Sequence, residues 1–401
     1  MTATIAGAVD ATALVRAAER RTERFVDTLR ELVGIDSGSH SPEGVDRVAD
    51  VLERRLRDGG WDVDRRRHAP AEGERRIGDL LVARVEGSGT HRVLLLCHMD
   101  TVFPDGTAAT RPFRVEGARG LGPGVSDAKA GLLAGIEAVG VLRELGFDRF
   151  GSVTFVCNPD EEVGSPFSGP VIRRLAGESD VAFVLEAGRE NGDIVSARKG
   201  VTTIHVELTG RAAHAGVEPE RGRHAVLDGA LKTAELQALT GLLPGATVNV
   251  GVLAGGIRPN VVPDSCVMEI DVRAFEESVL AEIRERVIGI VTEPKVEGVS
   301  ASVHLDIEHG PMERSPATER LVALAQELAG ELGFPLRDAS TGGASDANAI
   351  AAAGTPVLDG LGPVGGDDHG PDEWVDLSTV APRVAMLAGL VVRADEALGG
   401  A

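Results

Sequence analysis

Three short, largely apolar segments in the first half of the chain are each followed closely by acidic or histidine residues. They cover residues 93–97, 152–157 and 181–185. Apolar runs of this length, of which residues 93–97 are uninterrupted, are typical of strands that are buried on both faces of a sheet. A stretch with helical composition, residues 128–145, lies between the first two. This alternation predicts an α/β domain with a doubly wound, mostly parallel sheet and helices on both faces.

Further elements extend this pattern at both ends of the chain. Apolar residues recur at helical spacing over 11–34 and 43–58, and residues 80–85 have the composition of another strand. After Pro311 the alternation resumes. It predicts a helix over 317–333, a strand over 356–358 and a last helix over 380–398.

The middle of the chain has a different order of elements. Strands are predicted over 201–208, 246–253, 265–273 and 301–307, with helices over 224–240 and 277–292. The order β-α-β-β-α-β is that of a ferredoxin-like α+β domain. We therefore expect residues 198–309 to form a domain inserted into a discontinuous first domain made of 1–197 and 310–401.

Charge and cysteine content exclude several classes of protein. The 401 residues carry 41 Lys+Arg and 62 Asp+Glu, a net charge of −21, and no basic patch that would bind nucleic acid. The three cysteines, an odd and sparse number, argue against a disulfide framework. Neither a signal peptide nor an uninterrupted apolar run of ~18 residues is present, so we expect a cytoplasmic protein without a membrane span.

The polar residues that follow the predicted strands indicate a site. In open α/β sheets the ligand binds beyond the carboxyl ends of the strands, so residues at these ends meet at one edge. A glycine-rich turn, 122–127, and a late loop, 365–370, supply two further candidates. The residues concerned are His98, Asp100, Asp127, Asp160, Glu161, Glu162, Glu186 and His369.

Such a group of carboxylates is compatible with a metal site. Packed anions repel and are costly to remove from water, so they need cations. Two histidines and three carboxylates suit a pair of Zn²⁺ ions, and the lack of cysteine ligands favours a catalytic site. Taken singly, Asp127 could be a helix N-cap and residues 160–162 a solvated acidic turn. Their joint placement favours the metal site, where one further carboxylate would accept a proton from water.

The motifs of this chain resemble those of the M20 family of co-catalytic zinc peptidases and deacylases. That family contains glutamate carboxypeptidase, aminoacylase and succinyl-diaminopimelate desuccinylase. The resemblance extends from about residue 29 to residue 390. It is carried by residues 96–102, 122–131, 160–165, 185–186 and 213–216, and by the final His369.

The resemblance implies a role for each metal-site residue. Asp127 matches the carboxylate that bridges both metals. His98 and Glu186 match the other ligands of one metal. Glu162 and His369 match those of the second metal. The resemblance implies two Zn²⁺ per subunit, with Co²⁺ or Mn²⁺ as substitutes.

Three more residues match catalytic positions of the family. Glu161 matches the general base, and Asp100 matches the carboxylate that orients the ligand His98. His214, in the inserted domain, matches a histidine that reaches the partner subunit's active site and stabilises the oxyanion. The alternative for His214 is a surface histidine, and for Asp100 a simple turn residue.

A last group matches substrate-binding positions. Asn260 and Arg273 match residues that bind the free carboxylate of the substrate, for which the planar fork of arginine is well suited. Gly342 and Gly343 resemble a glycine turn beside the substrate. The alternatives are a surface arginine and an ordinary loop. Two basic residues of the glutamate carboxypeptidase lack a clean match, and Arg189, Arg198 or Lys199 are candidates to replace them.

The implied activity is hydrolysis of an amide bond next to an amino acid with a free carboxylate. The substrate would be a small peptide or an N-acyl amino acid, with glutamate as one candidate. Carbamoyl, ureido or small-acyl amides are an alternative, and a catalytically silent binding protein is a second. The inserted domain is expected to act as a lid and to join two subunits in a homodimer through paired edge strands.

Overall fold

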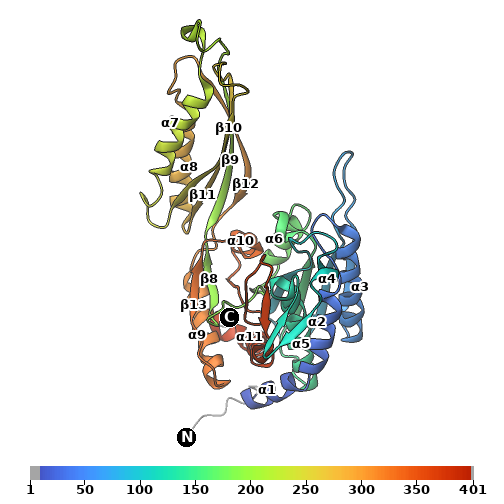
Figure 1. Ribbon diagram of the computed structural model, residues 1–401. Helices are drawn as coiled ribbons and strands as arrows, with labels where there is room; N and C mark the ends of the chain where they lie inside the picture. Colours follow the sequence, from blue (N-terminus) through green and yellow to red (C-terminus); the bar gives the residue numbers. More distant parts are fainter. Residues whose placement is uncertain (1–9, 399–401) are drawn as a thin grey trace. The chain divides into compact units, whose positions relative to one another are not determined.

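The computed structural model describes residues 10–398 and divides the chain into two units (Figure 1). The first unit comprises the chain up to Ser196, Arg314–Ser340 and the chain from Ser345 onward. The second comprises Ala197–Glu313 and Thr341–Ala344. Ala197 and residues 310–313 and 341–344, which were predicted to belong to the first domain, are thus grouped with the second unit.

The first unit is built around a six-stranded sheet in the order β1-β2-β6-β3-β7-β14. These strands are Asp62–Arg66, Leu80–Glu86, Ser152–Asn158, Arg92–His98, Val181–Val184 and Val357–Leu358. The last four are parallel to one another, whereas β2 runs antiparallel to both β1 and β6. The predicted mostly parallel α/β sheet is confirmed, and the antiparallel β1–β2 edge is an addition that the sequence pattern did not reveal.

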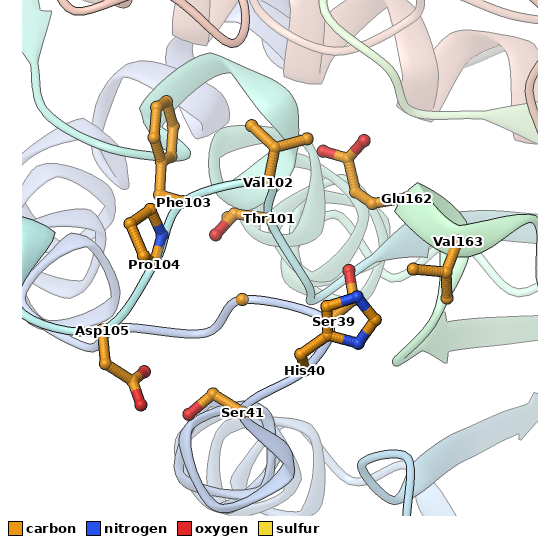
Figure 2. A pocket seen from close by; sticks show the side chains of 11 residues that line it. Ser39, His40, Ser41, Thr101, Val102, Phe103, Pro104, Asp105, Glu162 and Val163 are labelled. Atoms are coloured by element: carbon orange, nitrogen blue, oxygen red, sulfur yellow. The ribbon is translucent and has the colours of Figure 1, made fainter. Parts of the chain in front are cut away.

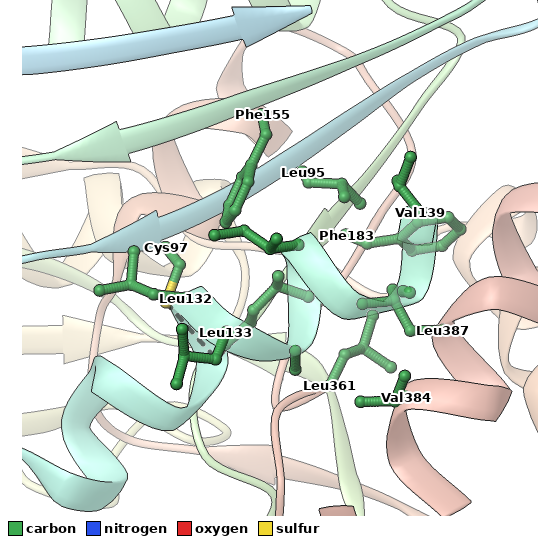
Figure 3. Close-up of a cluster of buried hydrophobic side chains, with 14 of the residues drawn as sticks. Leu95, Cys97, Leu132, Leu133, Val139, Phe155, Phe183, Leu361, Val384 and Leu387 are labelled. Carbon is green, nitrogen blue, oxygen red and sulfur yellow. Dashed lines mark hydrogen bonds between the residues drawn. The ribbon is translucent and has the colours of Figure 1, made fainter. Parts of the chain in front are cut away.

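One long helix, α5 (Ala130–Glu144), lies between the sheet and the C-terminal helix α11 (Val380–Leu398). Figure 3 shows Leu95, Phe155 and Phe183 of the sheet on one side of α5 and Val384 and Leu387 of α11 on the other. The stretch Leu377–Leu398 is long and apolar enough to cross a membrane, but most of its apolar part is buried in this core. Its apolar composition is therefore that of a core helix.

The remaining helices of this unit include two that the apolar spacing predicted as a single helix. The expected helix over 11–34 is divided into α1 (Ala11–Glu19) and α2 (Thr22–Val33). At the break Arg21 reaches across to α5, where its Nη1 donates to the buried carboxylate of Glu137 at 2.8 Å. The other helices are α3 (Pro42–Asp58), α4 (Thr107–Thr110), α6 (Gly169–Gly177), α9 (Pro316–Glu331) and α10 (Asp346–Ala352).

The second unit is a ferredoxin-like α+β fold, as expected. Its strands are β9 (Gly200–Thr209), β10 (Thr247–Gly255), β11 (Ser265–Ala274) and β12 (Ser300–His309), in the antiparallel order β10-β11-β9-β12. Helices α7 (Ala225–Gln237) and α8 (Glu277–Thr292) lie together beside this sheet (Figure 1). Alternating residues of β11, from Cys266 to Ala274, are buried in a core separate from that of the first unit.

Two small sheets complete the structure. One pairs β8 (Ile194–Arg198) with β13 (Asp338–Thr341). The other has the order β15-β16-β5-β4, formed by Gly365–Gly366, Trp374–Asp376, Arg119–Leu121 and Arg114–Glu116. This second sheet matters for the site, because it brings the C-terminal loop against the turn that precedes α5.

Candidate metal centre

The strand ends of the main sheet bring the first site residues together. Strand β3 ends at His98, which pairs in parallel register with Asn158 at the end of β6. A single 3-10 turn, Glu161–Val163, follows β6, and Glu186 follows β7 by two residues. Because β6, β3 and β7 are parallel neighbours, their carboxyl ends lie at one edge of the sheet.

Asp127 reaches this edge from the turn before α5. Gly124 has a φ of 70°, and a Cβ at this position would lie 2.6 Å from Thr101 Cγ2, so glycine is required there. Residues Val125–Lys129 form an irregular turn before α5, in which Asp127 and Ala128 depart from helical φ/ψ and the peptide bond between them is cis. The turn thus places the Asp127 carboxylate close to the end of β3.

The carboxylate of Asp127 lies between two imidazoles. Its Oδ1 is 2.8 Å from His98 Nε2, and its Oδ2 is 3.0 Å from His369 Nε2. On the His98 side, Glu186 Oε2 is 3.6 Å from the same Nε2. On the His369 side, Glu162 Oε2 is 3.4 Å from that Nε2. The five residues therefore form two groups, one histidine and one glutamate each, that share Asp127.

The charges in this cluster are poorly balanced without a cation. Burial would raise the pKa of Asp127, but its contacts with His369 and His98 lower it well below the ordinary value. Asp127 and Glu162 raise the pKa of His369 to about 11. Burial would lower the pKa of His98, yet Glu186, Asp100 and Asp127 raise it well above the ordinary value. The carboxylates thus create a strong preference for positive charge at the two imidazoles.

These residues fit a metal site. His98, Asp127 and Glu162 each offer one ligand atom, and the three atoms lie within 4.8 Å of one another. Glu162 Oε1 is buried and has no hydrogen-bond partner among the described residues. A buried carboxylate oxygen needs a partner, and a divalent cation would provide one. The nitrogen and oxygen donors are those that Zn²⁺ takes in catalytic sites.

Asp100 connects His98 to the glutamates. The backbone oxygen of Asp100 is 2.9 Å from His98 Nδ1, whereas its carboxylate Oδ1 is 3.5 Å away. The same carboxylate accepts hydrogen bonds from the backbone N–H groups of Glu161 and Glu162 at 3.1 and 3.2 Å. It also accepts one from Ser39 Oγ at 2.7 Å. Asp100 therefore positions both the imidazole and the glutamate turn.

Glu161 lies in an acidic environment. Removal from water raises the pKa of its carboxyl group well above the ordinary value, and the charges of Glu186 and Asp346 raise this pKa further. Asp346 is buried and accepts hydrogen bonds from Asn158 Nδ2 at 2.6 Å and Ser165 Oγ at 2.5 Å. Burial raises the pKa of Asp346 to about 7. A carboxyl group with a raised pKa is suited to accept and return a proton.

Sequence reasoning missed two carboxylates beside the site, Asp346 and Glu373. Glu373 is fully buried, and its carboxylate accepts hydrogen bonds from the backbone N–H groups of Gly124, Ser126 and Asp127 at 2.7, 2.8 and 3.0 Å. Burial raises the pKa of Glu373 to about 7. Both lie in loop or helix-start segments, and no motif marks them in the sequence.

The other predicted site residues lie in the second unit, in two groups. His214 is exposed and forms a bridge with Val261, and the next residue, Ala215, donates its N–H to the carbonyl of Asn260 at 3.0 Å. Arg273 Nη1 donates to the carbonyl of Gly342 at 2.8 Å. The Nε of Arg273 is held by Asp271 of the same strand at 2.9 Å.

Two further basic residues adjoin the Arg273 group. Arg198 Nη1 donates to the carbonyl of Gly343 at 3.1 Å. Lys199 Nζ lies 3.3 Å from Thr247 Oγ1 and over the ring of Phe275. Burial and the charge of Arg273 lower the pKa of Lys199. Arg189, the third candidate, belongs to the first unit.

Known proteins resemble this chain over most of its length. The model of peptidase family M20/M25/M40 matches residues 94–393. Carboxypeptidase G2 of Pseudomonas sp. (strain RS-16) is 29% identical over 389 residues, which are 94% of this chain and 91% of that protein. Acetylornithine deacetylase of Proteus mirabilis (strain HI4320) is 24% identical over 92% of this chain and 96% of that protein. The solved structure of aminopeptidase PepT from Bacillus cereus ATCC 10987 has the same fold, with a TM-score of 0.78 and 23% identity over 94% of this chain and 99% of that chain.

Proposed function

Because the chain belongs to the M20/M25/M40 peptidase family and is therefore a metal-dependent hydrolase of C–N bonds, we propose that it is a dinuclear zinc enzyme. Its substrate is an amide next to an amino acid with a free carboxylate. The observation that carries this proposal is the Asp127 carboxylate between His98 and His369, with one glutamate on each side.

The five side chains have defined roles in this proposal. Asp127, His98 and Glu186 would hold one ion, and Asp127, Glu162 and His369 would hold the other. Zn²⁺, or Co²⁺ or Mn²⁺ in its place, would supply polarisation of the scissile carbonyl and a lowered pKa of water. All five ligand positions are filled in this chain, which argues against a catalytically silent binding protein.

Glu161 is the proposed general base. It lies next to the ligand Glu162, and its raised pKa makes it able to take the proton from the attacking water and pass it to the leaving amine. Asp100 holds this turn, because its carboxylate accepts hydrogen bonds from the backbone N–H groups of Glu161 and Glu162. The proton therefore moves from water to the Glu161 carboxylate and from there to the amine nitrogen.

The free carboxylate of the substrate is assigned to the second unit. Arg273, Arg198 and Lys199 form a basic group beside the Gly342 and Gly343 carbonyls. Since Asp271 already occupies one edge of the Arg273 guanidinium, Lys199 is a second candidate for the carboxylate. Asn260 and His214 lie on adjacent segments, and we assign to His214 the stabilisation of the oxyanion in a partner subunit.

A homodimer through the second unit is part of the proposal. Among the described residues, seven of the ten large hydrophobic side chains that are exposed belong to this unit. They include Val252 and Leu253 on the edge strand β10, at 43% and 40% exposure. An apolar edge strand is a natural site for pairing between sheets.

The cytoplasm is the proposed compartment, because all three cysteines are buried free thiols.

Small-acyl amides are the second candidate class of substrate, and the similarity to acetylornithine deacetylase favours them. Carbamoyl and ureido compounds are a further candidate class, and the same experiment tests them. The experiment is release of free amino acid from a panel of dipeptides, N-acyl and N-carbamoyl amino acids, with and without chelator. We expect chelator-sensitive hydrolysis of at least one class. Absence of hydrolysis by zinc-loaded protein, or hydrolysis that chelator leaves unchanged, would contradict the proposal.

A further inference from the structure

The cavity beside Glu162, shown in Figure 2, belongs to the site already described, but another cavity of the first unit does not. It has a volume of about 390 Å³. Its walls come from the start of α2, the end of α3 with the residues that follow it, and the C-terminal part of α5. The α5 residues in the wall, from Ile136 to Glu144, lie roughly 13–25 Å along the helix from Asp127. A ligand in this cavity would therefore be separate from the metal centre.

Four guanidinium groups from three helices line this cavity. Arg21 and Arg24 lie at the start of α2, Arg55 lies on α3 and Arg143 lies on α5. One carboxylate, that of Glu137, is buried behind them. Its two oxygens accept hydrogen bonds from Arg21, Arg24 and Arg55 at 2.8 to 3.1 Å. Three positive charges thus share one negative charge.

The other carboxylates at the cavity do not balance this charge. The Glu144 oxygens accept hydrogen bonds from Arg20 Nε at 2.9 Å and from Arg21 Nε at 3.2 Å. Asp58 is exposed to solvent. With Arg20 included, five guanidinium groups stand against three carboxylates, whereas the whole chain carries a net charge of −21. This local excess of positive charge favours an anion.

Two of the arginines have donors to spare. Arg55 Nε is buried and has no hydrogen-bond partner among the described residues. Arg143 Nη2 donates to the carbonyl of Gly60 at 2.8 Å, and no carboxylate of the described residues forms an ion pair with Arg143. A buried N–H group without an acceptor is costly, and a bound anion would supply the acceptor.

The guanidinium groups are held in place by the backbone. Arg21 Nη2 donates to the carbonyl of Gly140 at 2.8 Å, and a Cβ at Gly140 would lie 2.5 Å from Arg21 Nη1. Gly60 has a φ of 75°, and a Cβ there would collide with the Arg143 guanidinium. The two glycines therefore make room for the arginines. Because the donors are fixed in advance, little ordering is needed when a ligand binds.

The directions of the donors select the kind of anion. They approach the cavity from three helices, whereas a carboxylate offers two acceptor oxygens in one plane. A phosphate group offers at least three acceptor oxygens in a tetrahedral arrangement, and guanidinium groups pair well with it. We propose that this cavity binds a phosphate group, either as inorganic phosphate or as the phosphate of a monoester. The inference goes beyond the hydrolase function and does not depend on it.

The test is titration calorimetry of the zinc-loaded protein with inorganic phosphate, repeated after the zinc has been removed by chelator and dialysis. We expect one phosphate per chain to bind with a Kd of about 1 mM or below, with and without zinc. Adenosine monophosphate is a separate arm, because tighter binding than that of inorganic phosphate would identify a monoester as the ligand. Glutarate, a dicarboxylate, should bind at least about tenfold more weakly than phosphate.

Two variants locate the binding. Arg143→Gln should weaken phosphate binding about tenfold or more, because a charged donor is lost. Arg24→Gln is the second variant, since the Arg24 side chain is 57% exposed, and it should have an effect in the same direction. Arg54→Gln is the matched control, because Arg54 lies on α3 beside Arg55, is 62% exposed and does not line the cavity. Its affinity should stay within about twofold of wild type.

Thermal unfolding gives a second readout of the same variants. Without phosphate, Arg143→Gln should unfold at the temperature of the wild type. Phosphate should raise the Tm of the wild type and of Arg54→Gln but not that of Arg143→Gln. The phosphate site would be overturned by equal affinities in all three variants, by binding that disappears with the zinc, or by glutarate that binds as tightly as phosphate. Absence of binding to the wild type up to about 10 mM phosphate would overturn it as well.

Discussion

At the residue scale, the proposed chemistry depends on one carboxylate that stays outside the proposed ligand set. Glu161 adjoins Glu162 in the chain, yet only Glu162 approaches His369. The substitution Glu161→Gln should retain both metals and lower kcat by about 10²–10⁴, because a positioned base is lost. Metal content per chain and kcat are measured on the same preparation. Full activity in a folded, metal-loaded variant would remove Glu161 from the mechanism.

A second residue-scale prediction concerns Asp346 and pH. Because burial raises its pKa to about 7, the folded protein binds the proton more tightly than the unfolded chain does. In the metal-free protein this group therefore costs stability progressively as pH rises from about 4 to about 7. Asp346→Asn removes that titration, so the stability of the variant relative to wild type should increase over this range, by up to about 4 kcal/mol. Urea unfolding at several pH values measures it, and parallel curves for the two proteins would contradict it.

The sequence indicated the site residues at strand ends but not their buried supports. His98, Glu162 and Glu186 were predicted as site residues because they follow apolar strands, a signal that is visible locally. Asp346 and Glu373 act through contacts with residues more than 180 positions away in the chain. Nothing in their neighbouring residues distinguishes them from surface acids, so single-sequence reasoning could not select them.

At the element scale, the turn before α5 depends on a distant carboxylate. Glu373 accepts three backbone hydrogen bonds from this turn and so fixes Asp127. Glu373→Gln should weaken metal binding about 10–100-fold, because an amide offers one acceptor oxygen in place of two. Titration of the apo protein with Zn²⁺ measures the affinity. Glu72→Gln, at an exposed loop position, is the control, and equal affinities in both variants would contradict the assignment.

Elements with strong periodicity were predicted well, and short ones were not. Helices α3, α8 and α11 and strands β3, β6 and β11 lie within one or two residues of their expected ranges. The small sheet β15-β16-β5-β4 was missed, because strands of two or three residues carry no periodic pattern. A periodic pattern can also hide a break. One helix was predicted over 11–34, because the apolar spacing continues through Arg20 and Arg21, where the structure separates α1 from α2.

At the scale of the whole molecule, the second unit is expected to join two subunits. Leu253→Lys places a charge on the exposed edge strand β10 and should convert the dimer to a monomer in sedimentation velocity experiments. Val115→Lys, on the first unit, should leave the dimer intact. A wild-type protein that sediments as a monomer at micromolar concentration would contradict this part of the proposal.

In the proposed enzyme, five side chains that are distant in the sequence hold two divalent cations around Asp127. Anomalous diffraction at the zinc edge, from a crystal of the zinc-loaded protein, tests it most directly. We predict two peaks about 3.5–4 Å apart, one beside His98 and Glu186 and the other beside Glu162 and His369, with Asp127 in contact with both. A single peak, or two peaks that do not share Asp127, would contradict the dinuclear centre.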